Sequence, residues 1–407
     1  MITVDAALRL VLEQATPLAP ARVPLGHALG CVLADDVASD LDSPPWDKSM
    51  VDGYAIRVAD LATGTAELEI LEEIVAGAVP TRSVVPGATT RIMTGAPLPP
   101  GSEAVVMVER AELLDERRVR LADKPPRPGQ NILVRGSSFR RGERIIPRDT
   151  LLGPVHIGLL CEVGCAEPVV RPRPRVAILS TGNELVSAAE TPRPGQIRNS
   201  NGPMLAALTS KVNATPIELG VARDELADLR RRIAAGLESD LLVLSGGVSA
   251  GVLDLVPSVL AELGVAQIFH KVNLKPGKPI WFGSREAAGH RTLVFGLPGN
   301  PVSSLVGFEL FVRPAIERRA GRSTAPHSIV RALIDNGPFT QRGDRTTYYP
   351  ATCDSAAHGG AARLSVRLLP WQGSADLRTL AAANALVVFP AGERTYATGD
   401  EVDALLL

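Results

Sequence analysis

The chain has 407 residues, of which 45% are hydrophobic and 21% charged, so several hydrophobic cores and about two to four domains are expected. Its formal net charge of −1 gives no electrostatic reason to bind nucleic acid or an anionic membrane surface, so affinity for anions has to come from local loops. The low aromatic content of 4%, beside 37 Gly and 33 Pro, favours many loops and short elements over a helical bundle.

The first fifteen residues have the pattern of an amphipathic helix, with Thr3 in the position of its cap. They lack the basic start and long apolar core of a signal peptide. No uncharged apolar stretch of about 18 residues or more occurs in the chain. We therefore expect a cytoplasmic protein without a membrane partner.

Four cysteines are scattered along the chain, and only Cys161 and Cys165 are close together. Their spacing places them on one face of an apolar helix predicted over 153–164. No CxxC motif or Cys/His cluster suggests a zinc site, so we interpret them as buried structural thiols.

The middle of the N-terminal half has the pattern of a β-rich insertion. The double proline at 44–45 is a boundary, because neither a helix nor a central strand passes through two prolines. Over 66–143, short runs in which apolar and charged residues alternate are separated by Gly and Pro turns. This pattern predicts a small, half-exposed sheet or barrel.

From about residue 173 to 321 the chain alternates between apolar strand runs and helical runs. Alternation of this kind predicts a parallel sheet with helices on its faces, with ligands bound beyond the carboxyl ends of the strands. After 327 the pattern returns to short strands and predicts a small β domain of roughly eighty residues. The strands predicted in the α/β part are VAILS, TPIEL, LLVLS, AQIFHKV, PIWFG and TLVFGL.

The most informative segment, DLLVLSGGVSAGVLD over 240–254, is a buried strand that ends in a Gly/Ser turn before a helix-like run. Such a turn presents bare backbone N–H groups and suits phosphate. A plain tight connection explains the segment equally well, and no GK[ST] follows these glycines. The phosphate interpretation gains support from a second Gly-rich turn at 295–304 and a basic loop at 274–279. The residues concerned are Ser245, Gly246, Gly247, Ser249, Lys275, Lys278, Pro298, Gly299, Asn300 and Pro301.

Two carboxylates follow strands of this predicted sheet. Glu184 comes just after the first strand, at what we predict to be a helix start, and Asp254 follows the third. Either one can bind magnesium or take part in acid/base chemistry, or can simply favour the dipole of a helix N-terminus. If the sheet is parallel, both reach the same rim.

Polar residues in the β-rich part form a second candidate group. Asp47 and Asp52 flank a small turn that contains Ser49, and two acids at this spacing can hold a hard cation. The spacing alone favours an Asp-capped surface loop. Thr94 ends an apolar strand before Gly95, where a hydroxyl and a bare N–H can meet an oxyanion or simply form a turn.

Taken together, six segments in chain order resemble the molybdopterin molybdenumtransferase family, which completes molybdenum cofactor and includes the C-terminal domain of gephyrin. The resemblance covers essentially the whole chain, and it is the joint pattern that is specific. The segments are PPWDKSMVDGYAIR, RIMTGAPLPPG, STGNEL, LSGGVSAGVLD, LKPGKP and GLPGNPVSS.

The resemblance implies an α/β plus β fold, in an elongated homodimer of multidomain subunits. A central three-layer α/β domain of molybdopterin-binding type would be accompanied by the β-rich insertion and a C-terminal β-barrel-like domain. The boundaries we predict are 1–43 with 142–172 for the N-terminal helix and linking α+β domain, 44–141 for the insertion, 173–322 for the α/β domain and 323–407 for the barrel.

The resemblance also implies that molybdate is inserted into adenylylated molybdopterin with release of AMP and with Mg²⁺ assisting. The cleft would lie between the α/β domain of one subunit and the small β domain of the other, and the upstream adenylyltransferase and client molybdoenzymes would be further partners. Matched by motif, Asp52, Thr94, Glu184 and Asp254 stand at the family's catalytic positions, and Glu184 and Asp254 at its metal. Ser49 and the residues of the three loops stand at its substrate-binding positions.

The chain departs from the family's usual pattern in one direction, because several acids are replaced. Asn183 and Asn199 stand where acids are common, Val252 and Leu253 precede a lone Asp254, and Ser138 closes a Gly-Ser-Ser in place of Gly-Glu-Asp. Lys48 replaces a common Asn. A site with fewer acids should bind a divalent cation more weakly and repel molybdate less.

Three functions therefore compete at this point. The first is an active molybdenumtransferase, which the surviving acids and lysines favour. The second is a weak or inactive paralogue that binds molybdopterin or its adenylate as carrier, sensor or scaffold, which the replaced acids favour. The third is a nucleotidyltransferase that makes the adenylate from ATP, against which the extra β-rich segments argue.

Overall fold

A computed structural model describes residues 1–247, 255–322, 329–358 and 361–407, and it divides the chain into two units. The first unit contains residues 1–21, 30–32 and 170–407, and the second contains 22–29 and 33–169. The finer division into four domains that the sequence suggests stays a prediction.

A six-stranded sheet forms the centre of the first unit, in the order β17-β14-β18-β22-β21-β19. The first four of these strands are parallel, but β21 runs antiparallel to both β22 and β19. The prediction of a parallel sheet was therefore wrong at one edge: only Ala288 and Gly289, both at positive φ, connect β21 to β22, and so short a turn permits only a hairpin. The bounds are β14 (Arg175–Thr181), β17 (Thr215–Ala222), β18 (Leu241–Ser245), β19 (Ala266–His270), β21 (Trp281–Ala287) and β22 (His290–Leu297).

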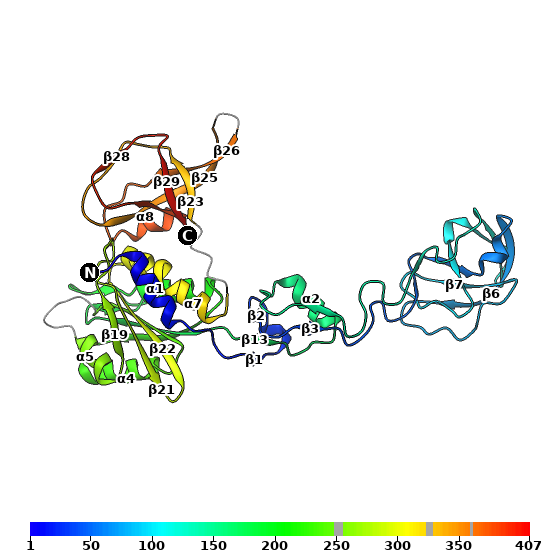
Figure 1. Cartoon of the computed structure of the whole chain (residues 1–407), viewed down its shortest axis with the longest axis horizontal. Helices are drawn as coiled ribbons and strands as arrows, with labels where there is room; N and C mark the ends of the chain where they lie inside the picture. The colour runs from blue at the N-terminus through cyan, green and yellow to red at the C-terminus, as the bar shows by residue number, and fades with distance from the viewer. Residues whose placement is uncertain (248–254, 323–328, 359–360) are drawn as a thin grey trace. The chain divides into compact units, whose positions relative to one another are not determined.

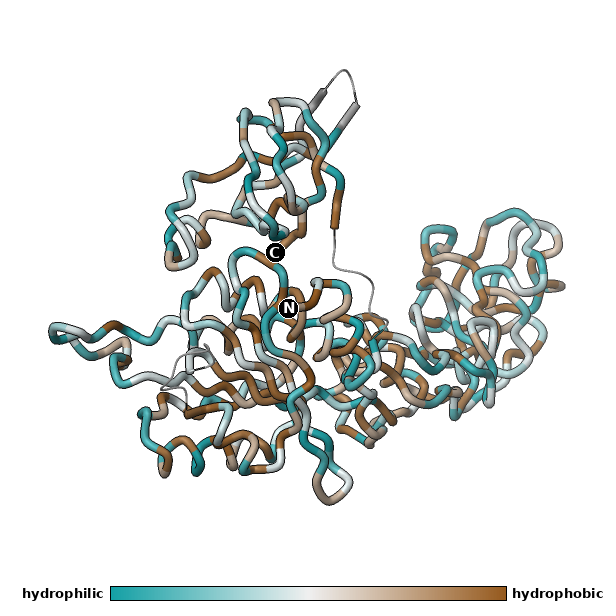
Figure 2. Tube along the Cα trace, turned by 60° about the vertical axis from the view of Figure 1, so that its left-hand side comes forward, coloured by the Kyte–Doolittle hydropathy of each residue, from teal (hydrophilic) through white to brown (hydrophobic). Residues whose placement is uncertain are grey.

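Helices cover both faces of this sheet, as the alternating pattern predicted (Figure 1). One face packs on a core with α1, α3 and the long helix that follows β22, and the other face packs on α4 and α5. Figure 2 shows the hydrophobic colour running along strands inside this unit, which agrees with two-sided burial. The helices are α1 (Val4–Gln14), α3 (Asn201–Lys211), α4 (Leu226–Gly236), α5 (Leu255–Glu262), α6 (Pro301–Gly307) and α7 (Arg313–Arg319), with a π-helical turn η4 (Phe308–Val312) joining the last two.

The predicted cap of the first helix is confirmed: the Thr3 hydroxyl oxygen accepts a hydrogen bond from the Ala6 N–H at 3.2 Å. None of the described helices is long and apolar enough to cross a lipid bilayer.

The C-terminal part forms a closed barrel, which confirms the predicted β-barrel-like domain. Five strands follow in the order β25-β26-β23-β29-β27, and a pairing between β25 and β27 closes the ring. Strand β20 adds to β25 from outside the ring. The short helix α8 (Leu377–Ala382) was not predicted. The strands are β20 (Leu274–Lys275), β23 (Ile329–Ile334), β25 (Thr346–His358), β26 (Ala361–Leu368), β27 (Ala385–Phe389) and β29 (Glu401–Leu406), with a separate pair β24 (Phe339–Gln341) and β28 (Arg394–Tyr396).

The second unit contains the predicted β-rich insertion as a six-stranded sheet in the order β8-β5-β7-β6-β10-β9. Its strands are β5 (Gly53–Ile56), β6 (Thr65–Ile74), β7 (Ala88–Ile92), β8 (Ala104–Met107), β9 (Ala111–Leu113) and β10 (Arg118–Ala122). Shorter elements complete it: β3 (Val37–Ala38), β4 (Lys48–Ser49), β11 (Ile132–Leu133), β12 (Arg144–Ile146), α2 (Pro154–Glu162) and the 3-10 turns η1 (Leu25–His27), η2 (Val58–Leu61) and η3 (Val108–Arg110). Strands β1 (Ala21–Arg22), β2 (Val32–Leu33) and β13 (Val169–Arg171) include residues of both units.

The prediction for the paired cysteines was partly wrong. Helix α2 ends at Glu162, because Gly164 adopts a positive φ of 77°, so Cys165 lies beyond the helix. Cys161 is exposed and Cys165 half-buried, whereas Cys31 and Cys353 are buried. All four are free thiols. Cys161 and Cys165 do not share a buried helix face.

Candidate active site

The carboxyl ends of three neighbouring parallel strands lie level with one another. Ser180 of β14 pairs with Ser245 of β18, and Ser245 pairs with Leu297 of β22. The loops that follow these strands therefore leave the sheet at one edge, which is where open α/β sheets bind their ligands. The parallel strand ends that the sequence predicted are therefore level here, whereas the meeting of Glu184 with Asp254 at this rim stays a prediction, because Asp254 lies outside the described residues.

A pocket of about 880 Å³ opens among these loops, and we call it the glycine pocket. Seven of the residues that the sequence predicted line it: Glu184, Ser245, Gly246, Gly247, Gly299, Asn300 and Pro301. Ser249 and Asp254, the remaining predictions for this loop group, lie outside the described residues.

The turn after β18 requires glycine at two successive positions. Gly246 and Gly247 have φ of 90° and 63°, in the left-handed region that side chains disfavour. A Cβ added at Gly246 would lie 2.7 Å from the backbone oxygen of Thr181, and one at Gly247 would lie 2.7 Å from both the Thr181 hydroxyl and Val256. The turn therefore has no room for side chains at these two positions. The Gly246 N–H is taken by the Leu297 carbonyl at 3.0 Å, so it is not one of the free donors that the phosphate interpretation needs.

Glu184 lies where the sequence placed it, after β14, but the predicted helix start there was wrong. The chain turns at Asn183 and Glu184 and then forms the short strand β15 (Leu185–Val186), which pairs with β16 (Ile197–Arg198). The Glu184 carboxylate folds back over Gly182, since a Cβ on that glycine would lie 2.4 Å from a carboxylate oxygen. Glu184 thus has no helix dipole to favour and remains an exposed carboxylate at the pocket.

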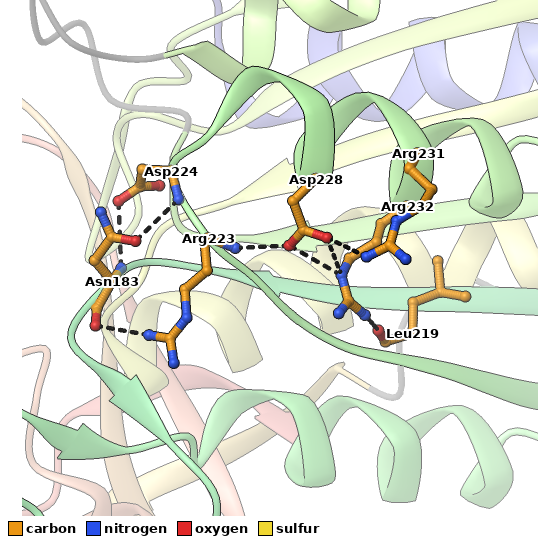
Figure 3. Close-up of polar contacts among 7 residues, drawn as sticks. All are labelled: Asn183, Leu219, Arg223, Asp224, Asp228, Arg231 and Arg232. Carbon is orange, nitrogen blue, oxygen red and sulfur yellow. Dashed lines mark hydrogen bonds and ion pairs between the residues drawn. The ribbon is translucent and has the colours of Figure 1, made fainter.

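A second carboxylate of the glycine pocket, Asp224, was not predicted from the sequence. It follows the end of β17 and is fastened to Asn183 by two reciprocal hydrogen bonds (Figure 3). The Asn183 N–H donates to an Asp224 carboxylate oxygen at 3.3 Å, and the Asp224 N–H donates to the Asn183 side-chain oxygen at 3.1 Å. The Arg223 guanidinium also donates to the Asn183 carbonyl at 2.9 Å. An acid directly after a strand end was the available signal, the same one that identified Glu184.

Asn201, at the start of α3, holds the loops of the glycine pocket together. Its side-chain N–H₂ donates to the Ser245 hydroxyl at 2.8 Å and to the Gly299 carbonyl at 2.7 Å. Because a carbonyl only accepts, this contact fixes which end of the amide is nitrogen. The side-chain oxygen of Asn201 and the hydroxyl of Thr181 are buried at the pocket and have no hydrogen-bond partner among the described residues. Polar atoms of this kind suit a ligand that forms hydrogen bonds.

A second pocket, of about 620 Å³, lies beside Lys275 and Lys278, and we call it the cationic pocket. Both lysines are exposed and neither forms an ion pair with another described residue. Arg342 and Arg345 line the same pocket, and no carboxylate is found among its described lining residues. Arg342 pairs with Glu393 at 3.8 Å and Arg345 with Asp344 at 3.9 Å, but neither carboxylate lines the pocket, and both lysines are unpaired among the described residues. The excess of positive charge suits an oxyanion.

The two pockets share a wall. Asn300 lines both of them, and its side-chain N–H₂ donates to the Ser374 hydroxyl at 2.8 Å. Pro298 lines the cationic pocket and Pro301 the glycine pocket, so the predicted loop 298–301 lies between them. The two pockets therefore adjoin at Asn300.

Both walls of the cationic pocket come from the same chain. The cleft between the α/β domain of one subunit and the small β domain of the other, which the resemblance implies, stays a prediction. The barrel is held to the α/β part of its own chain by the pairing of Lys275 with Thr347 and by the Val302 N–H, which donates to the Ser374 carbonyl at 3.0 Å. Arg342, Arg345 and Ser374 were missed because nothing in the local sequence connects a barrel loop to a distant pocket.

Asp52 and Thr94, both predicted, are brought into direct contact in the second unit. One oxygen of Asp52 accepts hydrogen bonds from the Thr94 N–H and from the Thr94 hydroxyl, each at 2.7 Å. These two bonds, first that from the backbone, lower the pKa of Asp52, so the carboxylate is ionised at neutral pH. Both residues are exposed, as a site open to a ligand requires.

The other predicted residues of this segment have roles inside the fold. The Ser49 side chain is buried, and its hydroxyl donates to the Val51 carbonyl at 2.6 Å. Asp47 accepts a hydrogen bond from the Arg135 N–H at 2.7 Å, away from the Asp52–Thr94 contact. Within the described ranges, no group of three or more His, Cys, Asp or Glu residues could hold a metal ion, which favours the capped loop over a cation site here.

Three family models match consecutive regions of the chain. The MoeA N-terminal region (domain I and II) matches residues 2–164, a probable molybdopterin binding domain matches 177–318, and the MoeA C-terminal region (domain IV) matches 336–407.

Full-length relatives and solved structures agree with these models. The chain is 34% identical to a molybdopterin molybdenumtransferase of Bacillus subtilis (strain 168), over 100% of this chain and 94% of the relative. It is 35% identical to one of Nostoc sp., over 95% of this chain and 88% of the relative. A crystal structure of a molybdopterin biosynthesis MoeA protein from Pyrococcus horikosii superposes with a TM-score of 0.78 at 30% identity, covering 100% of this chain and 99% of that one.

Proposed function

The chain belongs to the molybdopterin molybdenumtransferase family, and on this basis we propose that it inserts molybdate into adenylylated molybdopterin and releases AMP. The observation that carries the proposal is the pair of adjoining pockets at the carboxyl edge of the sheet. One presents a glycine turn and unpaired polar atoms, and the other presents four cations and no described carboxylate.

In this proposal each of the two pockets binds a different substrate. The glycine pocket holds the phosphate-bearing part of the adenylylated molybdopterin against the turn at Gly246 and Gly247 and the side chain of Asn201. The cationic pocket holds the molybdate dianion between the lysines and arginines. The shared wall at Asn300 keeps the oxyanion next to the dithiolene sulfurs that become its ligands, which is the proximity that insertion needs.

Release of AMP breaks the phosphoanhydride bond of the adenylate: a water oxygen adds to one phosphorus while the bridging oxygen leaves with the other phosphate, and negative charge develops on that oxygen. Lys275 and Lys278 line the adjoining cationic pocket and form no ion pair with a described residue, so they would hold the molybdate beside the bond that breaks. Because they are not neutralised by described neighbours, their full charge is available to the substrate.

We further propose that Mg²⁺ assists, and the residues present fit such an ion. Glu184 and Asp224 are exposed carboxylates lining the same pocket, and one or two carboxylates together with substrate phosphates are the ligands Mg²⁺ usually takes. When bound, the ion offsets pyrophosphate charge. Asp254 remains a proposed third acid, since it lies outside the described residues.

We propose that the chain works as a homodimer in which Asp52 and Thr94 act on the substrate held by a second subunit. Three large apolar side chains near this contact are exposed, namely Trp46 at 51%, Met50 at 56% and Met107 at 40%. Exposed apolar groups beside a polar pair are typical of a surface that another protein covers. The upstream adenylyltransferase and client molybdoenzymes, in the cytoplasm, would be its transient partners.

One observation favours a second function, that of a carrier or scaffold that binds the adenylate without turnover. Asn183 stands where the family commonly has an acid, and it contacts Asp224 directly, so the carboxylates at this pocket are fewer than the family pattern suggests. The pockets themselves are equally compatible with binding alone.

Reconstitution separates the two functions. The purified chain is mixed with adenylylated molybdopterin, molybdate and Mg²⁺, and both AMP and the ability to activate an apo-molybdoenzyme are measured. An active enzyme releases AMP only when molybdate is present. Tight binding of the adenylate without AMP release would establish the carrier and reject the enzyme.

A further inference from the structure

Thr347 is a buried threonine of the cationic pocket whose hydroxyl forms no hydrogen bond with any described residue. It lies on β25 directly opposite Lys275 of β20, and its side chain is 2% exposed. The hydroxyl oxygen has almost no surface accessible to water. A polar group in this state is costly to a folded protein, because it has lost its hydrogen bonds to water and gained none in return.

Other buried threonines of the same chain show the usual solution. The hydroxyl of Thr89 donates to the Ala55 carbonyl at 2.8 Å, and that of Thr292 donates to the Leu237 carbonyl at 2.8 Å. Valine has almost the shape of threonine and would fill the site of Thr347 in a strand without the cost. Thr90 and Thr209 are also buried with unpaired hydroxyls, so what distinguishes Thr347 is that it lines the cationic pocket, where a ligand can supply the missing partner.

The surroundings of Thr347 indicate the chemistry of that partner. Lys275, Lys278, Arg342 and Arg345 bring only positive charge and N–H donors to the pocket, so whatever binds there is an anion rich in acceptor oxygens. A hydroxyl in such a pocket completes the donor set. We expect the hydroxyl to reach the ligand through another of the staggered rotamers about the Cα–Cβ bond.

We propose that Thr347 is a binding residue for the oxyanion of the cationic pocket, to which its hydroxyl donates a hydrogen bond. The inference rests on the proposed function only in identifying that tetrahedral oxyanion as molybdate. The Thr347 hydroxyl adds a neutral hydrogen-bond donor, at a fixed position on strand β25, to the charged side chains of the pocket. The pocket can then select an oxyanion by geometry as well as by charge.

The test compares Thr347→Val with wild type in two measurements, calorimetric titration with sodium molybdate and thermal unfolding without ligand. We expect the affinity for molybdate to fall about tenfold, as for loss of one hydrogen bond to a charged group. We expect the ligand-free variant to unfold at the same temperature or higher, since an unpaired hydroxyl has been removed. Thr347→Ser, which keeps the hydroxyl, should restore affinity.

The matched control is Thr90→Val. Thr90 lies on β7 in the other unit, is fully buried and likewise has no described partner for its hydroxyl. Like Thr347→Val, this variant should unfold at the wild-type temperature or higher. Unlike Thr347→Val, it should bind molybdate with wild-type affinity. If Thr347→Val does not fold, Thr347→Ala, which needs no additional space, replaces it in the same comparison.

The outcomes separate this inference from the proposed function. Molybdate binding by Thr347→Val that equals wild type, or no molybdate binding by wild type, overturns the inference. If wild type binds molybdate and Thr347→Val binds it about tenfold more weakly, the inference stands even when no AMP is released in reconstitution. A variant that loses thermal stability but keeps its affinity would show a merely structural threonine.

Discussion

The turn at Gly246 supports a quantitative prediction, because the structure holds it from two sides. Its N–H donates to the Leu297 carbonyl at 3.0 Å, and a Cβ would lie 2.7 Å from the Thr181 backbone oxygen. Both neighbours are backbone atoms of the central sheet, so neither can yield as a flexible side chain would. Gly246→Ala therefore meets two costs, the positive φ of 90° and the steric contact.

Each cost has a usual size. An L-residue in the left-handed region costs about 1–2 kcal/mol, and overpacking in a well-packed site costs about 1–3 kcal/mol. We expect the free energy of unfolding to fall by about 2–5 kcal/mol in Gly246→Ala. Gly264 provides the control: its φ is 80°, and nothing lies within 4 Å of its added Cβ. Gly264→Ala should therefore lose only about 1–2 kcal/mol, the backbone cost alone.

Urea unfolding followed by tryptophan fluorescence, to which Trp281 in the same sheet contributes together with Trp46 and Trp371, measures both variants against wild type. Gly246→Ala should also lose AMP release. Gly264→Ala should retain it, because Gly264 does not line the glycine pocket. Equal unfolding midpoints for the two variants would refute the steric argument. Full activity in Gly246→Ala would refute the assignment of this turn to the substrate.

Three further predictions concern charged groups. Hydrogen bonds from arginines lower the pKa of Asp228 to about 2. Asp228→Asn should therefore lose roughly 1 kcal/mol of unfolding free energy at pH 7 in chemical denaturation, after a discount for solvent screening. Because the folded pKa is depressed, the difference from wild type should shrink as pH falls from about 4 toward 2. Thr94→Val removes one of the two bonds to Asp52 and should raise that pKa and slow AMP release about tenfold, with an unchanged circular dichroism spectrum. Asn183→Asp adds a negative charge beside Asp224, and calorimetry should show Mg²⁺ bound about three- to tenfold more tightly and molybdate more weakly.

The sequence predicted the parts of the site that depend on local pattern. Buried apolar runs identified the strands, and the residues just after them, such as Gly246, Glu184 and 298–301, had to meet at one rim because parallel strands end together. The contact of Asp52 with Thr94 joins residues 42 positions apart, and only the family resemblance linked them. It is an antiparallel pairing of β5 with β7 that brings them together.

The parts that failed depend on contacts between distant segments. Arg345, Ser374 and Thr347 come from a barrel whose attachment to the α/β part rests on the pairing of β20 with β25, which no periodicity reveals. The helix expected at Glu184 gave way to the short β15–β16 pair, because a carboxylate after a strand end is as compatible with a turn as with a helix. The hairpin of β21 and β22 was hidden because a buried antiparallel strand has the same continuous apolar pattern as a parallel one.

Asn183 and Asn199, which replace acids common in the family, each form hydrogen bonds at the glycine pocket. The Asn183 side-chain oxygen accepts the Asp224 N–H, and the Asn199 side-chain oxygen accepts the Gly202 N–H at 3.1 Å and the Ser180 hydroxyl at 3.1 Å. A carboxylate oxygen would accept the same bonds, so the amides keep the geometry of the loops and remove only negative charge. The change is therefore electrostatic rather than structural: a pocket shaped for the substrate presents less repulsion to an incoming dianion and a weaker site for a divalent cation. A protein that only carries the adenylate would not need these hydrogen-bond acceptors to be kept around the pocket. An enzyme that depends on its cationic pocket more than on its metal would need them.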